Sequence, residues 1–195
     1  MAIDRDLELM LRVRQGDAES FDLLLNRHRG PLVSFFSRMV RDQALAEDLA
    51  QEVFLRVYQA RHRYQPEARF TTWLYRIATN LALNALRDRK GIRAAVEGEA
   101  EASQAESKVE RLPDSQPTAE QGMMLTEREK TIRQAVQSLP ENQRAAVILH
   151  KYQDVGYRQI AKILGVSEGA VKSLLFRAHE NLRIRLEPLL RGGQL

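Results

Sequence analysis

Residues 157–177 read YRQIAKILGVSEGAVKSLLFR, and this stretch predicts two short helices joined by a tight turn. Gly165 suits the turn because glycine adopts a left-handed backbone without a Cβ clash, and Ser167 suits the N-cap of the second helix. Apolar residues at helical spacing line one face of each helix: Ile160, Ala161, Ile163, Leu164, Val171, Leu174 and Leu175. The pattern is typical of a helix-turn-helix, and the alternative is an ordinary helical hairpin within a bundle.

The polar side of the second helix carries candidate contacts to duplex DNA. Glu168, Lys172, Ser173 and Arg177 lie opposite its apolar face. In a DNA-binding helix-turn-helix, the N-terminal part of the second helix enters the major groove. The earlier of these side chains therefore stand where base edges would be met.

The composition of the 195 residues excludes several classes of protein. There is no cysteine, so disulfides, thiolate catalysis and cysteine-based zinc sites are excluded, and a reducing compartment is favoured. No segment approaches the roughly 20 apolar residues of a membrane span, and the N-terminus lacks a basic region followed by a long apolar run. We therefore expect a soluble, cytoplasmic protein without membrane insertion.

The net charge of +4 is unevenly distributed along the chain. Lys and Arg outnumber Asp and Glu by 15 to 12 in residues 1–90 and by 12 to 7 in residues 122–195, whereas residues 91–121 have 3 against 7. Basic ends suit a polyanionic partner such as nucleic acid, although such an excess is also common on solvated helices.

The chain divides into two helical halves and a linker, so we expect an all-α protein of two small domains. Residues 1–90 and 122–195 each predict four helices and no strand. In the first half, Gly30-Pro31 predicts a kink or local break in a helix. Thr71 or Thr72 is expected to cap the last helix of this half. Residues 91–121 are rich in Glu, Ala and Ser and are interrupted by prolines, which predicts a flexible linker. A helix from about Thr118 is expected to open the second half.

A predicted helix over residues 43–60 has two distinct faces. Leu45, Leu49, Val53 and Val57 are four apart and should lie in the core. Another face combines Asp48, Gln51 and Glu52 with two apolar groups that we expect to be exposed, Phe54 and Leu55. Such a face suggests a docking surface for a basic protein partner; the alternative is a solvated face with partly buried apolar groups.

Aromatic rings alternate with arginines between residues 56 and 76. Bases stack on rings while guanidinium groups follow phosphates, so this composition suits a binder of single-stranded nucleic acid. The alternative for Trp73 and Tyr75 is an ordinary place in the core. The rings are Tyr58, Tyr64, Phe70, Trp73 and Tyr75, and the cations are Arg56, Arg61, Arg63, Arg69 and Arg76.

Blocks in the same order along nearly the whole chain resemble the extracytoplasmic-function (ECF) sigma factors of bacterial RNA polymerase. The blocks are GDAESFDLLLNRH, AEDLAQEVFLRVYQA, FTTWLYRIATN and SLPENQRAAVILHKYQDVGYRQIAKILGVSEGAVKSLLFRA, with a variable linker before the last. The resemblance implies that residues 1–90 form the region-two domain and residues 122–195 the region-four domain. It also implies that the protein is not an enzyme but directs core polymerase to promoters.

The resemblance assigns three sets of site residues, one for the polymerase and two for promoter DNA. The residues implied to bind the polymerase are Asp48, Gln51, Glu52, Phe54 and Leu55. A second set is implied to recognise and melt the minus-ten element and to capture an unstacked base. Its members are Arg56, Tyr64, Phe70, Trp73, Arg76 and Asn80. The residues implied to recognise the duplex minus-thirty-five element are Ser167, Lys172, Ser173, Phe176 and Arg177.

Two positions depart from the family pattern, and one further partner is implied. Ala170 stands where Thr is common and Leu174 where Arg is usual, so we expect a phosphate or base contact to be missing and salt dependence to be lower. The family also implies an anti-sigma factor that covers the polymerase and DNA surfaces. The acidic linker is read either as a segment that occupies a basic channel of the polymerase or as a solvated tether.

The sequence also bears on two other functional classes. An autonomous helix-turn-helix regulator, with the first half as a ligand or dimerisation domain, is the alternative to a sigma factor. A hydrolase or metalloenzyme has little support, because there is no HExxH motif, glycine-rich phosphate loop or nucleophile elbow. The four histidines, His28, His62, His150 and His179, are scattered, so no metal or cofactor is expected.

Overall fold

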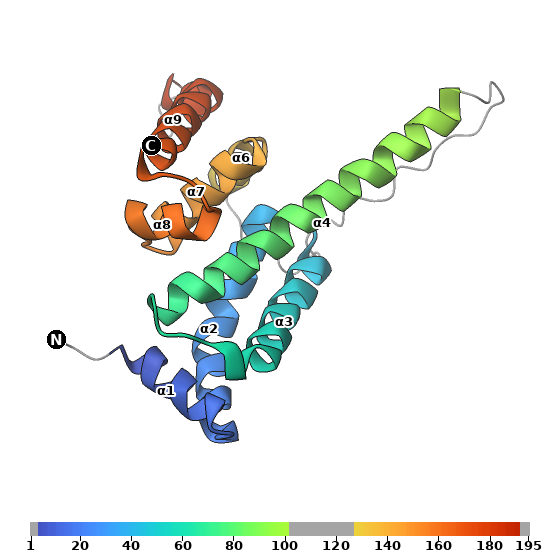
Figure 1. Ribbon diagram of the computed structural model, residues 1–195. Helices are drawn as coiled ribbons and strands as arrows, with labels where there is room; N and C mark the ends of the chain where they lie inside the picture. Colours follow the sequence, from blue (N-terminus) through green and yellow to red (C-terminus); the bar gives the residue numbers. More distant parts are fainter. Residues whose placement is uncertain (1–3, 102–126, 192–195) are drawn as a thin grey trace.

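A computed structural model describes residues 4–101 and 127–191, and every regular element in these ranges is helical (Figure 1). The first half contains α1 (Arg5–Arg14), α2 (Ala18–Met39), α3 (Gln43–Gln59), a short 3-10 turn η1 (Arg61–Arg63) and α4 (Phe70–Glu101). The second half contains α6 (Glu127–Gln137), α7 (Glu141–Tyr152), α8 (Tyr157–Leu164) and α9 (Glu168–Arg191). The predicted all-α class is confirmed.

Aspartates cap the first three helices, which explains where these helices begin. The carboxylates of Asp4, Asp17 and Asp42 accept hydrogen bonds from backbone N–H groups of the first turn of α1, α2 and α3. Asp17 also accepts from the Ser20 hydroxyl at 2.8 Å, and the bonds from Ser20 lower the pKa of this carboxyl. Gly16, with a φ of 98°, separates α1 from α2.

The first half packs around α2, which lies against α1, α3 and α4. The predicted seam of α3 is confirmed, because Leu49, Val53 and Val57 are buried and Leu45 is partly buried. Other large buried side chains of this core include Leu9, Met10, Val13, Leu24, Leu32, Phe35, Phe36, Met39, Phe70 and Leu74.

The second half contains the predicted helix-turn-helix. Gly165 ends α8 in the left-handed conformation, with φ 67° and ψ 35°, and Val166 N–H donates to the Ala161 carbonyl at 3.0 Å. Ser167 Oγ accepts from Ala170 N–H at 3.1 Å and caps α9. The core positions of α8 and α9 are Ile160, Ala161, Ile163, Val171, Leu175 and Ala178, all buried.

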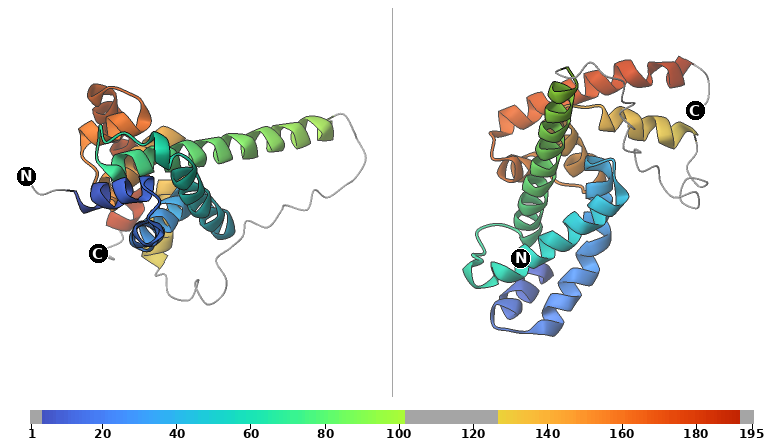
Figure 2. Two further views of the ribbon diagram at one scale, coloured as in Figure 1. Left: turned by 60° about the horizontal axis from the view of Figure 1, so that its bottom comes forward. Right: turned by 90° about the vertical axis from the view of Figure 1, so that its right-hand side faces the viewer.

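The two halves lie against each other along several pairs of helices. Helix α8 packs on α4, and α7 packs on α2 (Figures 1 and 2). Helix α6 also contacts α2. The helix-turn-helix is therefore next to the N-terminal part of α4 (Figure 1).

Helix α2 runs through Pro31 without a break, so of the predicted kink or local break at Gly30-Pro31 only the kink stays a prediction. Two other sequence predictions about helix boundaries are wrong. Thr71 and Thr72 lie inside α4 because this helix begins at Phe70. Helix α4 also continues beyond residue 90 to Glu101, since residues 91–101 are rich in the helix formers Ala and Glu. The rest of the predicted linker and the predicted helix start at Thr118 lie outside the described residues.

The left-handed turn at Gly165 generates a stability prediction. Gly165→Ala should lower the free energy of unfolding by about 1 kcal/mol, because an L-residue is strained at this φ even though no atom lies within 4 Å of the added Cβ. Gly169→Ala is the control, since it lies in α9 and the added methyl meets only Ser167 Oγ at 3.8 Å. Urea unfolding followed by circular dichroism checks both, and equal effects of the two variants would contradict the prediction.

Candidate functional site

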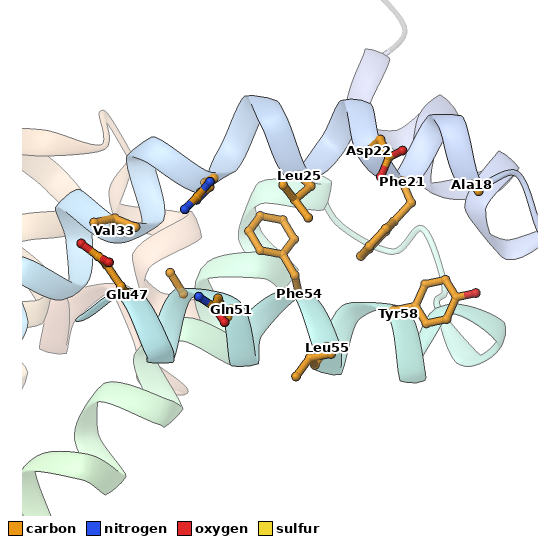
Figure 3. Close-up of a pocket in the computed structure, with 12 residues that line it drawn as sticks. Ala18, Phe21, Asp22, Leu25, Val33, Glu47, Gln51, Phe54, Leu55 and Tyr58 are labelled. Carbon is orange, nitrogen blue, oxygen red and sulfur yellow. The ribbon is translucent and has the colours of Figure 1, made fainter. Parts of the chain in front are cut away.

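A groove of about 650 Å³ runs between α2 and α3 (Figure 3). Phe21 and Leu25 project from α2 and Phe54 from α3, so the floor of the groove is apolar. Polar and charged side chains lie along it. The lining residues are Ala18, Phe21, Asp22, Leu25, Arg29, Val33, Glu47, Ala50, Gln51, Phe54, Leu55 and Tyr58.

Phe54 and Leu55 are placed differently from each other. The prediction that both are exposed is wrong for Phe54, which is 5% exposed and packs edge-on against Phe21 with ring centroids 6.4 Å apart. Leu55 is 56% exposed and projects away from α2 (Figure 3). The difference arises because α2 passes alongside α3 and covers the side of the helix that carries Phe54.

The predicted acidic face of α3 is present beside the groove. Asp48 and Gln51 are exposed and Glu52 is partly exposed. Glu52 accepts a 2.7 Å ion-pair hydrogen bond from Arg56 one turn later, so two residues predicted to contact different partners pair with each other here. The face therefore offers Asp48 as a free carboxylate two helical turns before the exposed Leu55.

Three aromatic residues of the predicted minus-ten set form one cluster at the start of α4. The Tyr64 ring lies 4.9 Å from the Trp73 ring and 6.3 Å from the Phe70 ring, between centroids. Tyr64 and Phe70 are buried, whereas Trp73 is partly exposed. Neither Tyr64 nor Phe70 presents a free ring face, so stacking of a base on Tyr64 requires the 64–69 loop to move.

Burial also affects the hydroxyl of Tyr64. Its Oη is buried without a hydrogen-bond partner, and desolvation, reinforced by Asp4, raises the pKa of Tyr64 to about 12. Tyr75, for which a core position was the alternative, is 4% exposed and its hydroxyl donates to Gln153 Oε1 of the second half. Burial raises the pKa of Tyr75 as well.

The remaining predicted minus-ten residues are on the surface. Arg76 and Asn80 are exposed on α4, one turn apart, on the same side of the helix as Trp73. Arg56 is exposed on α3. The structure thus leaves a partly exposed ring, an amide and a cation in a row along α4.

The predicted DNA-contacting residues of α9 lie on its exposed face. Lys172, Arg177 and Phe176 are exposed, and Phe176 is 67% exposed. Ser173 is exposed, but its hydroxyl donates to the Gly169 carbonyl at 3.1 Å, and Ser167 Oγ is engaged as the helix cap. Leu174 is partly buried against the core, so it does not extend this face.

Sequence reasoning missed the α2 wall of the groove, and it assigned Tyr58 to nucleic-acid binding rather than to the lining of this groove. Phe21 contacts both Phe54 and Tyr58, and Arg61 lies 4.0 Å above the Tyr58 ring. The signal was the width of the apolar arc on α2, where Phe21 and Leu25 flank the fully buried Leu24. When the apolar face of a helix is wider than the area that one neighbouring helix covers, some of its apolar side chains remain at the surface.

In residues 4–101 and 127–191, no group of three or more His, Asp or Glu side chains could hold a metal ion. Within the same ranges, no helix is long and apolar enough to cross a membrane.

Comparison with known proteins agrees with this arrangement. Residues 24–92 match the Sigma-70 region 2 family, and residues 129–182 match the Sigma-70, region 4 family. The RNA polymerase sigma-H factor of Pseudomonas aeruginosa is 36% identical over 190 residues, which cover 96% of this chain and 97% of that protein. The chain belongs to the ECF sigma factors of RNA polymerase.

Other sigma factors match over nearly their whole length. RNA polymerase sigma factor CarQ of Myxococcus xanthus is 36% identical over 89% of this chain and 93% of its own. The ECF RNA polymerase sigma-E factor of Escherichia coli K12 is 34% identical over 95% of this chain and 96% of its own. The autonomous regulator weighed above is therefore not favoured, because both halves match sigma regions.

Two solved structures have the same fold. CnrH in complex with the cytosolic domain of CnrY has a TM-score of 0.70 at 19% identity and covers 95% of this sigma factor and 99% of that chain. Sigma factor RpoE in complex with the anti-sigma factor NepR, from Bartonella quintana, has a TM-score of 0.64 at 21% identity, with coverages of 87% and 98%.

The buried Tyr64 hydroxyl generates a prediction about stability and pH. Tyr64→Phe should raise the free energy of unfolding at pH 7 by about 1 kcal/mol, because it removes a buried polar group without a partner. The raised pKa of Tyr64 means that the unfolded chain loses this proton first, so wild type should lose stability as pH rises from 10 towards 12. The Tyr64→Phe variant should lose less stability than wild type between pH 10 and pH 12.

Urea unfolding at pH 7 and pH 11 measures both effects. Tyr58→Phe is the control, since Tyr58 is 44% exposed. A variant less stable than wild type at pH 7 would show that the hydroxyl has a partner.

Proposed function

We propose that this sigma factor binds core RNA polymerase through the α3 face beside the groove between α2 and α3. The observation that carries the proposal is that Asp48, Gln51 and Leu55 are exposed together on one side of α3, although Leu55 is large and apolar. An exposed carboxylate beside an apolar side chain complements a basic, amphipathic partner. The groove supplies an adjoining apolar surface to which Phe54 and Tyr58 contribute.

We further propose that residues 1–90 act as the region-two domain, which recognises and melts the minus-ten element. Trp73, Arg76 and Asn80 support this role, because a partly exposed ring, a cation and an amide along one side of α4 suit an unstacked base and its phosphates. In this proposal, Tyr64 and Phe70 form the back of the pocket, and Arg56 leaves its ion pair with Glu52 to contact DNA.

The second half is proposed to read the minus-thirty-five element as the region-four domain, residues 122–195, with residues 91–121 connecting the two. Helix α9 enters the major groove in this proposal. Lys172 and Arg177 contact phosphates or bases, and Phe176 makes apolar contact. Ser167 and Ser173 keep their intrahelical bonds and pack close to the backbone of the duplex.

The chain acts in this proposal as a non-catalytic subunit in the cytoplasm, with promoter DNA first as a duplex and then partly single-stranded. An anti-sigma factor is a further proposed partner. Support comes from RpoE and CnrH, which were solved in complex with the anti-sigma factor NepR and with the cytosolic domain of CnrY. The α3 face and the α9 face are the surfaces that such a partner would cover.

Charge reversal on α3 tests polymerase binding. Asp48→Arg should weaken the affinity for core polymerase about tenfold, because the new cation meets a basic partner surface. Asp88→Arg, which makes the same charge change at an exposed position on α4, is the matched control. Binding is measured with labelled sigma factor and purified core enzyme. Equal affinities of Asp48→Arg and Asp88→Arg would contradict the docking proposal.

Removal of two cations from α9 tests upstream DNA binding. Lys172→Ala with Arg177→Ala should erase the minus-thirty-five footprint of the holoenzyme and reduce the slope of log affinity against log salt by about 2, since two phosphate contacts are lost. Arg183→Ala with Arg185→Ala removes two exposed cations further along the same helix and should leave the footprint intact. An unchanged footprint for the first pair would contradict the assignment of α9.

A further inference from the structure

The first two turns of α9 carry few side chains that can hydrogen-bond to a base. Four positions in residues 168–174 are apolar or lack a side chain: Gly169, Ala170, Val171 and Leu174. The Ser173 hydroxyl already donates to the Gly169 carbonyl at 3.1 Å. Direct recognition of bases by these two turns therefore depends mainly on the two remaining polar side chains, Glu168 and Lys172, which are both exposed.

Glu168 and Lys172 lie one helical turn apart, on the same side of α9. Side chains at this spacing have Cβ atoms about 5–6 Å apart, and a Glu followed by a Lys four residues later can form a stabilising ion pair. Within residues 4–101 and 127–191, however, neither side chain takes part in an ion pair or hydrogen bond. Both charged groups are therefore available to DNA.

A free carboxylate on a DNA-binding face is unfavourable unless it meets a hydrogen-bond donor. Duplex DNA carries one negative charge per about 1.7 Å of its axis, so phosphates repel Glu168 whatever the sequence. The donors that the major groove presents are the exocyclic amino groups of cytosine and adenine, and Glu characteristically accepts from cytosine N4. Glu168 thus lowers the affinity for DNA in general and raises it only for particular sequences.

We propose that Glu168 is a specificity-determining residue, which accepts a hydrogen bond from the N4 amino group of a cytosine in the minus-thirty-five element. This inference rests on the proposed function, in which α9 enters the major groove. Lys172, one turn later, contacts a guanine or a phosphate in this arrangement, and its charge offsets that of the carboxylate.

The alternative is a purely structural role for Glu168 in the first turn of α9. A carboxylate at this position stabilises a helix through the helix dipole. The turn is also capped independently of Glu168, because Ser167 Oγ accepts from Ala170 N–H at 3.1 Å. A structural role predicts that substitution of Glu168 changes the stability of the second half but not the choice of base.

Selection from a promoter library with a randomised minus-thirty-five element tests the proposal, using core polymerase reconstituted with the full-length sigma factor. Wild type should select cytosine at one position, and replacing that cytosine should weaken binding about tenfold. Glu168→Ala should lose the preference at this position alone and should bind unrelated duplex more tightly, because a negative charge is removed. Glu168→Gln should prefer adenine there, since Gln can pair with adenine N6 and N7.

Glu180→Gln is the matched control. It makes the same change as Glu168→Gln on the same helix, about 18 Å further along, where Glu180 accepts from Arg183 at 3.2 Å. This variant should keep the base preferences of wild type. Urea unfolding of all variants measures the structural contribution of each side chain separately from DNA selection.

The possible outcomes separate the proposal from the proposed function. If Glu168→Ala keeps the cytosine preference, or if wild type selects an element without a required cytosine, the proposal is wrong and the sigma function stands. Weaker selection at every position, accompanied by a lower free energy of unfolding, would indicate the structural role and would also overturn the proposal. A wild-type holoenzyme that selects no minus-thirty-five sequence at all would refute both the proposal and the proposed function of α9.

Discussion

The packing of α2 is the constraint on which the rest of the structure depends. This single helix lies against α1, α3 and α4 on one side and against α6 and α7 on the other. Its fully buried side chains include Leu24, Leu32, Phe35 and Phe36, so covering its apolar surface needs elements from both halves of the chain. The groove beside α3 remains where that cover is incomplete, at Phe21 and Leu25. One helix therefore organises the core, the docking groove and the boundary between the halves.

Local patterns in the sequence predicted the elements that depend on neighbours along the chain. Gly165 and Ser167 were placed correctly because a left-handed turn and an N-cap are determined by a few adjacent residues. The buried seam at Leu49, Val53 and Val57 followed from helical periodicity for the same reason. The end of α4 was missed because a shift towards Glu and Ala is equally compatible with a linker and with a helix.

Features that depend on distant residues could not be predicted in this way. Phe54 is buried only because α2 passes beside it, and Tyr64 only because its loop folds back onto Phe70 and Trp73. The bond from Arg144 to the Met39 carbonyl joins residues more than 100 positions apart. The site residues on exposed helix faces were accessible to sequence reasoning, whereas those in the aromatic cluster depended on tertiary packing.

The unpartnered hydroxyl of Tyr64 destabilises the aromatic cluster locally. A buried donor without an acceptor raises the free energy of the resting conformation, and this cost disappears when the group reaches water or an outside acceptor. Displacing Tyr64 therefore breaks no hydrogen bond of its side chain. The unpartnered hydroxyl therefore lowers the free-energy cost of moving the loop where, in the proposed function, a nucleotide base has to enter.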